Sequence, residues 1–152
     1  MSIDSFMYYG TDDVYLNYLA RFVKLGGPVG TAGSGLVREL DGPVPEPLRP
    51  WWTPGMWCFH SAAWWRRHWE RTGFMDIQVA DTMAEGWQLW RDWQKVIAPD
   101  NVVEIAALEA DRGQILGYVR VVGRRREGAT LEEPIVSIPA QYTKCPLLRG
   151  AG

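Results

Sequence analysis

The sequence has little cysteine, no excess of one charge and no long apolar run, and each of these absences excludes a class of protein. Two cysteines, Cys58 and Cys145, are too few and too far apart for a disulfide framework or a metal site. Sixteen basic residues against 18 acidic ones give a net charge of -2, which predicts no general attraction to nucleic acid. No apolar run reaches the roughly 18 residues that cross a membrane, and the first residues lack the layout of a signal peptide. The sequence therefore predicts a soluble, cytoplasmic chain.

The length and composition predict one domain of ordinary size with many tryptophans. The 152 residues are enough to bury a core, and 47% of them are hydrophobic. Nine are tryptophan, six of them between residues 51 and 69 and three in one predicted helix. A density of this kind indicates either an aromatic core or the wall of a pocket for a flat or cationic ligand. Trp87, Trp90 and Trp93 share one face of the predicted helix, which favours core.

Helices and buried strands alternate along the chain. Helices are predicted over residues 14–23, 61–73, 85–97 and 102–111, and strands over residues 2–3, 28–32, 74–80 and 115–122. Ser61 and Asp100 are the predicted caps of the second and fourth helices, and residues 33–35 are predicted to break the second strand. This alternation favours an α/β fold with a partly parallel sheet. Residues 1–125 form the predicted domain, and residues 126–152, with three prolines, predict an extended tail.

Residues 36–60 form a long excursion between regular elements and are a candidate substrate-side loop. Five prolines exclude regular structure over most of it, and long ordered loops of this kind are often functional. Trp51, Trp52 and Trp57 lie in this excursion and are candidates for lining a pocket. His60 ends it, where a neutral imidazole is suited to act as a general base. The alternative for His60 is a surface or capping histidine.

The segment after the predicted first strand contains Asp4, Ser5, Tyr8 and Tyr9. Ligands of open α/β sheets bind beyond the carboxyl ends of the strands, so these side chains are candidates for the site. The alternative is a connection that packs on the core. The glycine run at residues 30–35 matches neither phosphate-binding fingerprint and predicts a plain turn.

Several of these segments together resemble class I S-adenosylmethionine-dependent methyltransferases. Residues 2–10 are similar to the family's fourth strand and the segment after it. Lys24-Leu25-Gly26-Gly27-Pro28 is similar to the L-K-P-G-G turn that opens the fifth strand, with Leu25 where proline is usual. Residues 60–74 resemble the helix and sixth strand of the small-molecule branch, which includes ubiquinone methyltransferases and cyclopropane-fatty-acid-synthase-like enzymes. Residues 115–124 resemble the antiparallel seventh strand.

The resemblance implies the C-terminal half of such an enzyme, with a Rossmann-like α/β fold. Its mixed sheet would have the strand order four-five-seven-six and flanking helices. The resemblance also implies S-adenosylmethionine as the cofactor and a methyl group transferred to a small-molecule acceptor. The implied roles are catalysis by His60 and Tyr8, cofactor binding by Asp4 and Ser5, and acceptor binding by Tyr9, Trp51, Trp52 and Trp57.

The family's glycine-rich cofactor loop, and the acidic residue that binds the ribose hydroxyls, have no counterpart in the sequence. The resemblance places both before Met1, so the sheet edge at the fourth strand is expected to be open. An open edge favours self-association or pairing with a separate N-terminal half. A non-catalytic half-domain that binds a partner through this edge is therefore the alternative function. A third reading is a tryptophan-lined binder of quaternary amines.

Overall fold

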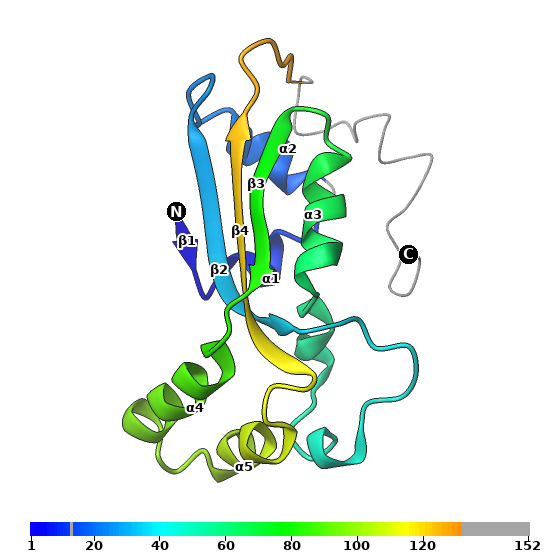
Figure 1. The fold of residues 1–152 in the computed structure, drawn as a ribbon, viewed down its shortest axis with the longest axis vertical. Helices are drawn as coiled ribbons and strands as arrows, with labels where there is room; N and C mark the ends of the chain where they lie inside the picture. Colours follow the sequence, from blue (N-terminus) through cyan, green and yellow to red (C-terminus); the bar gives the residue numbers. More distant parts are fainter. Residues whose placement is uncertain (13, 132–152) are drawn as a thin grey trace.

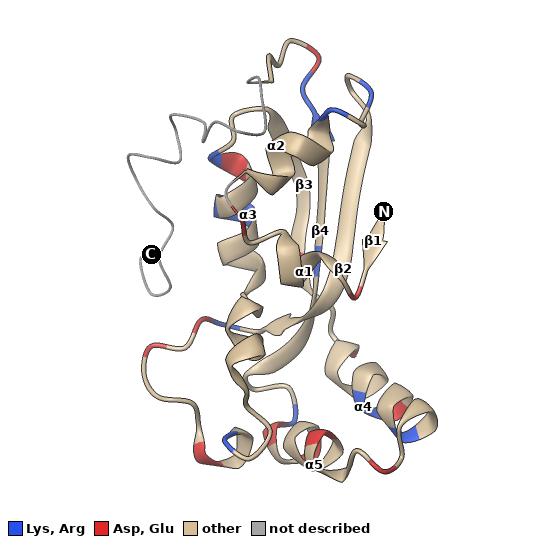
Figure 2. Cartoon of the chain, turned by 180° about the vertical axis from the view of Figure 1, so that it is seen from behind, with Lys and Arg blue, Asp and Glu red and all other residues tan. Residues whose placement is uncertain are grey.

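The computed structural model describes residues 1–12 and 14–131 and shows a four-stranded sheet with helices beside it and at one end (Figure 1). The strands are β1 (Ser2–Ile3), β2 (Pro28–Leu36), β3 (Met75–Thr82) and β4 (Leu116–Arg125). The helices are α1 (Phe6–Tyr9), α2 (Tyr15–Ala20), α3 (Ala62–Glu70), α4 (Gly86–Ile97) and α5 (Val102–Asp111), with short 3-10 helices η1 (Glu46–Leu48) and η2 (Pro54–Cys58) in the excursion. Helices α1, α2 and α3 lie on one face of the sheet, whereas α4 and α5 lie at its end (Figure 2).

The sheet has the order β1-β2-β4-β3, which confirms the predicted order four-five-seven-six and the mixed α/β fold. β1 is parallel to β2, and β4 is antiparallel to both β2 and β3. Because β2 and β3 each run against β4, the carboxyl ends of β1, β2 and β3 lie at one end of the sheet. Helices α4 and α5 occupy that end (Figure 1). Open α/β sheets bind their ligands there.

Strand β2 continues through the glycines that were predicted to break it, and that prediction was wrong. A Cβ atom at Gly33 would lie 2.2 Å from Cε of Met7, and one at Gly35 would lie 2.8 Å from the carbonyl oxygen of His60. The glycines therefore let α1 and the end of the excursion approach the strand closely. Their role is packing within a strand, and a turn does not form.

Local signals predict the start of α3 and the strand after it correctly. Ser61 Oγ accepts a hydrogen bond from the N–H of Trp64 at 3.2 Å, as expected of a helix cap. Gly73 has a φ of 76°, a left-handed conformation that glycine adopts without strain, and the chain turns there into β3. Strand β4 also lies where the Val- and Ile-rich run predicts it.

Three predicted helix ends were wrong. Helix α3 ends at Glu70, three residues before Gly73. Helix α2 ends at Ala20, three residues before Val23, and the chain continues in tight turns. The guanidinium of Arg125 donates to the carbonyl oxygens of Ala20 and Val23 at 2.9 and 2.8 Å. A side chain from β4 thus satisfies carbonyls that a longer helix would have used internally. The residue before α5 is Asn101, and Asp100 does not cap that helix.

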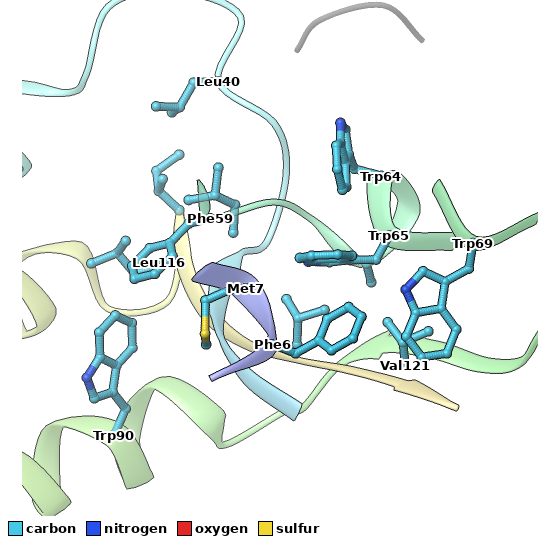
Figure 3. Packing of buried hydrophobic residues seen from close by; sticks show 14 of the residues in the cluster. Phe6, Met7, Leu40, Phe59, Trp64, Trp65, Trp69, Trp90, Leu116 and Val121 are labelled. Carbon is cyan, nitrogen blue, oxygen red and sulfur yellow. The ribbon is translucent and has the colours of Figure 1, made fainter. Parts of the chain in front are cut away.

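The core joins α3 to α1 through aromatic rings. Trp65 and Trp69 pack against Phe6 with ring centroids 5.5 and 5.6 Å away (Figure 3). Trp69 is fully buried, and Val121 of β4 lies below it (Figure 3). Helix α1 has only four residues, so this packing holds it in place more than its own hydrogen bonds do.

The predicted tail lies mostly outside the described residues, which end at residue 131. At its start, the N–H of Arg126 donates to the carbonyl oxygen of Phe74, and Leu131 packs against the core. Every helix in the described part of the chain is too short or too polar to cross a bilayer.

Candidate functional site

A cavity of about 670 Å³ lies beyond the carboxyl ends of β1, β2 and β3. Asp4 after β1, Ser34 of β2 and Met83 after β3 all line it. Helix α1, the excursion, α4, α5 and the start of β4 supply the remaining walls. The cavity is therefore built from segments that lie far apart in the sequence and meet only at this end of the sheet.

Asp4 occupies a special backbone position at the rim of the cavity. Its φ of 53° turns the chain from β1 into α1 within two residues, and aspartate is one of the few residues that tolerate this conformation. Its N–H donates to the carbonyl oxygen of Ala32 at 2.9 Å. Burial, and then the hydrogen bond to the Asp4 carboxylate, raise the pKa of Tyr118 well above its usual value. Tyr118 therefore stays protonated and donates to Asp4.

Of the other residues predicted after the first strand, only Tyr8 lines this cavity. Burial, and then the nearby Cys58 and Asp4, raise the pKa of Tyr8, so its hydroxyl is a hydrogen-bond donor at neutral pH. Tyr9 points elsewhere: its hydroxyl lies 3.0 Å from Ser5 Oγ, and hydrogen bonds with serine lower its pKa.

Tyr9 lines a second, shallower hollow with Tyr8, Tyr15 and Tyr18. Ser5 lies beside that surface, with its Oγ also 2.8 Å from Oγ of Ser2. The structure therefore brings Asp4 and Tyr8 together at the cavity, and puts Ser5 and Tyr9 on the adjacent surface.

The aromatic wall of the cavity differs from the predicted one. Trp51 lines the cavity, as predicted, and its ring lies 5.7 Å from that of Trp90. Trp52 and Trp57 pack on each other at 5.5 Å and do not line the cavity. Helix α4 supplies the rest of the wall through Trp90 and Trp93.

Trp87, Trp90 and Trp93 were predicted to be core, and this holds only for Trp90, which is 7% exposed. Trp93 is 58% exposed and stands at the cavity. Helical spacing identifies a shared face but does not say what that face covers.

Glu104 of α5 is a site residue that sequence reasoning missed. Its Oε1 accepts from Nε1 of Trp90 at 2.9 Å, and its Oε2 accepts from Nδ2 of Asn101 at 2.7 Å. It lines the cavity together with Asp4. No local motif marks it, because its partner in α4 lies 14 residues away.

His60 lies behind the cavity wall, next to Phe59, which does line the cavity. Its ring is stacked on Trp64 at 3.6 Å, and its Nδ1 lies 3.2 Å from Oε2 of Glu39. A carboxylate beside Nδ1 favours the tautomer that carries its proton on Nδ1. In that tautomer Nε2 carries no proton and can accept one, as a general base requires. Burial raises the pKa of Glu39, but hydrogen bonds from His60 and the Ser61 N–H outweigh it and lower that pKa overall.

The described residues contain no group of three or more His, Cys, Asp or Glu side chains placed to hold a metal ion. The polar side chains that line the cavity are two carboxylates, the hydroxyls of Tyr8, Ser34 and Tyr118, and the amide of Gln94.

The fold is that of Rossmann-like methyltransferases. Two structures of phosphoethanolamine N-methyltransferase 2 from Haemonchus contortus match it with a TM-score of 0.59 and 13% identity. One contains phosphomonomethylethanolamine and S-adenosylhomocysteine, and the other contains S-adenosyl-L-methionine. The match covers 82% of this chain and 32% of the methyltransferase.

The [4+2]-cyclase SpnF matches with a TM-score of 0.53 and 18% identity, over 84% of this chain and 50% of the cyclase. This chain therefore spans half or less of the length of these neighbours. No protein-family model matches the chain, and the comparison with curated proteins found no match. The likeness establishes the class I methyltransferase fold and does not extend to a particular branch.

Proposed function

We propose that the chain forms the acceptor-binding side of an S-adenosylmethionine-dependent methyltransferase that acts on a small molecule. The cavity of about 670 Å³ beyond β1, β2 and β3 carries this proposal, because its volume suits a small organic ligand. Its position is where open α/β sheets bind ligands. The fold alone does not specify a reaction, because one neighbour with this fold is a cyclase.

S-adenosylmethionine supplies an electrophilic methyl group on a sulfonium ion. In this proposal, Asp4, which lines the cavity, and Ser5, which lies on the adjacent surface, contact one side of such a cofactor. In the described part of the chain, no glycine-rich loop follows the carboxyl end of a strand, and Gly33 and Gly35 are occupied by packing within β2. In this proposal, the remaining cofactor contacts come from outside the described residues or from a second chain.

Two of the proposed acceptor-side residues are supported by their position. Tyr8 and Trp51 line the cavity, where the protonated hydroxyl of Tyr8 can donate to a polar group of the acceptor. The base role of His60 and the acceptor contacts of Tyr9, Trp52 and Trp57 stay predictions, because none of these four lines the cavity.

Isothermal titration of S-adenosylhomocysteine into the folded 152-residue chain tests the proposal. We expect a dissociation constant on the order of micromolar, and a several-fold weaker one in Ser5→Ala because a hydrogen-bonding hydroxyl is lost. Ser2→Ala is the matched control, since it removes the neighbouring hydroxyl, 2.8 Å from Ser5 Oγ, where no cofactor contact is proposed. A folded chain that binds no S-adenosylhomocysteine would exclude a cofactor site on this chain alone.

A second candidate function is association through the edge of the sheet at β1. Within the described residues, β1 pairs only with β2, so its outer edge is open. Apolar side chains are exposed at β1 and just after α2: Ile3 is 50% exposed and Phe22 is 71% exposed. An open strand edge that carries an exposed apolar side chain, as β1 does at Ile3, is suited to pairing with another chain.

Sedimentation velocity of the chain tests this second candidate. We expect self-association at micromolar concentration, and a shift toward monomer in Ile3→Lys, because a charge at the edge opposes strand pairing. Val96→Lys is the control, since Val96 is 75% exposed on α4, away from the edge. A chain that stays monomeric, or an Ile3→Lys variant that associates as before, would count against the edge as an interface between copies.

A further inference from the structure

The ionisable residues that line the cavity are all acids or tyrosines. Asp4 and Glu104 line it, and no lysine, arginine or histidine does so among the described residues. Walls of one charge sign raise the local concentration of the opposite charge. A phosphate or carboxylate group would find no cationic partner there, and an ammonium group would find two carboxylates.

Neutral groups hold both carboxylates in place. Glu104 accepts from Trp90 and Asn101, and Asp4 accepts from the Tyr118 hydroxyl. In the described part of the chain neither acid forms an ion pair, whereas other acids, Glu109 among them, pair with lysine or arginine. A neutral donor orients a carboxylate without cancelling its charge, and an ionised carboxylate has room for further donors.

Tryptophan rings stand beside the carboxylate of Glu104. Trp51 and Trp90 meet edge to face, with centroids 5.7 Å apart and planes at 63°, and so form a corner of the cavity. The bond from Trp90 Nε1 to Glu104 places a carboxylate at the edge of this corner. Indole faces attract cations through their quadrupole, and tryptophan is the strongest side chain in this respect.

From these observations, we propose that the cavity binds an organic ammonium ion with an apolar or aromatic body, held by Glu104 and Asp4 against the rings of Trp51 and Trp90. The identity of the methyl acceptor rests on the proposed function. If the chain takes part in methyl transfer, the acceptor is an amine without a phosphate or carboxylate group. The apolar body would lie on Met7, Met56 and Met83, whose flexible side chains line the same cavity.

Calorimetric titration of the chain with 2-phenylethylammonium, 2-phenylethanol and 3-phenylpropionate tests this inference. These probes share the phenyl body and differ in charge. We expect the ammonium ion to bind about tenfold more tightly than the alcohol, and the carboxylate to bind most weakly. In Glu104→Gln, the preference for the cation should fall several-fold while binding of the alcohol is unchanged, because glutamine can still accept from Trp90.

Glu109→Gln is the matched control, since Glu109 lies on the same helix, outside the cavity, and should keep the full preference. Asp4→Asn is a second test, and it should also lower the preference for the ammonium ion over the alcohol. Asparagine tolerates the φ of 53°, so this substitution removes only the charge. Equal binding of the ammonium ion and the alcohol, or no binding of any probe by the folded chain, would overturn the inference. A preference for the cation without binding of S-adenosylhomocysteine would support the inference and exclude a cofactor site on this chain alone. Binding of S-adenosylhomocysteine without a preference for the cation would support a cofactor site and overturn the inference.

Discussion

Replacing Trp69 by alanine is expected to lower the free energy of unfolding by about 3–5 kcal/mol, a large part of what a domain of this size has. Trp69 is 0% exposed, and its ring packs on Phe6 of α1 at 5.6 Å. The substitution removes the indole from between α3, α1 and β4 and leaves a cavity that a rigid core fills only in part. Urea unfolding followed by circular dichroism measures the loss.

Trp93→Ala is the control for this prediction. Trp93 is 58% exposed, so the same truncation should cost less than about 1 kcal/mol. Similar losses in the two variants would show that the ring of Trp69 does not join the helices as described. Because α1 carries Met7 and Tyr8, a loosened α1 should also weaken binding in the cavity, and the calorimetric titrations measure that effect.

Acidification should destabilise the fold through His68, the second large effect. Burial lowers the pKa of His68 from 6.5 to about 4, even though its Nε2–H donates to the carbonyl oxygen of Gly10 at 3.0 Å and this bond opposes the shift. The ring is also stacked on Trp64, at 4.7 Å. Protonation would place a positive charge on a side chain that is 1% exposed.

The sign of the effect follows from proton linkage. Between pH 6.5 and about 4, the unfolded chain binds a proton on His68 and the folded chain does not, so the free energy of unfolding falls as the pH falls. The stability is complete above pH 6.5, and the loss approaches about 3 kcal/mol near pH 4. Urea unfolding at a series of pH values between 7 and 4 measures it.

The variant His68→Gln separates the contribution of His68 to the pH dependence of stability from that of the acidic side chains. The glutamine amide can donate to Gly10 but does not titrate, so the dependence on pH between 6.5 and 5 should be largely lost. Glu39, whose pKa is lowered overall, would account for destabilisation at lower pH in both proteins. An unchanged pH dependence in His68→Gln would assign the effect to other groups.

Sequence alone predicts those features whose causes lie within a few residues of one another. Ser61 caps α3, Gly73 allows the turn into β3, and the branched residues of β4 form a strand, all as expected. The order of the strands was also predicted, through the resemblance of short segments to a family whose topology is known. The cap, the turn and the strand follow from local backbone preferences, which act the same way in any surroundings, whereas the strand order came from the resemblance.

Where side chains from distant segments compete for the same space, local preference was a poor guide. The glycines of β2 are typical of a turn, yet they lie within a strand because Met7 and the carbonyl group of His60 approach it. Arg125 lies more than 100 residues after Ala20 in the sequence, yet its guanidinium donates a hydrogen bond to the carbonyl oxygen of Ala20 at the end of α2.

The sequence by itself determined the fold class, the strand order and the placement of Asp4 and Tyr8 in the segment that follows the first strand. Only the tertiary structure decided that Glu104 and Trp90 line the same cavity as these two residues, that Tyr9 points away, and that His60 does not line the cavity. The physical reason is that a cavity is the space left between packed elements. Its lining depends on how α4 and α5 dock at the end of the sheet, and no local pattern in either helix encodes that docking.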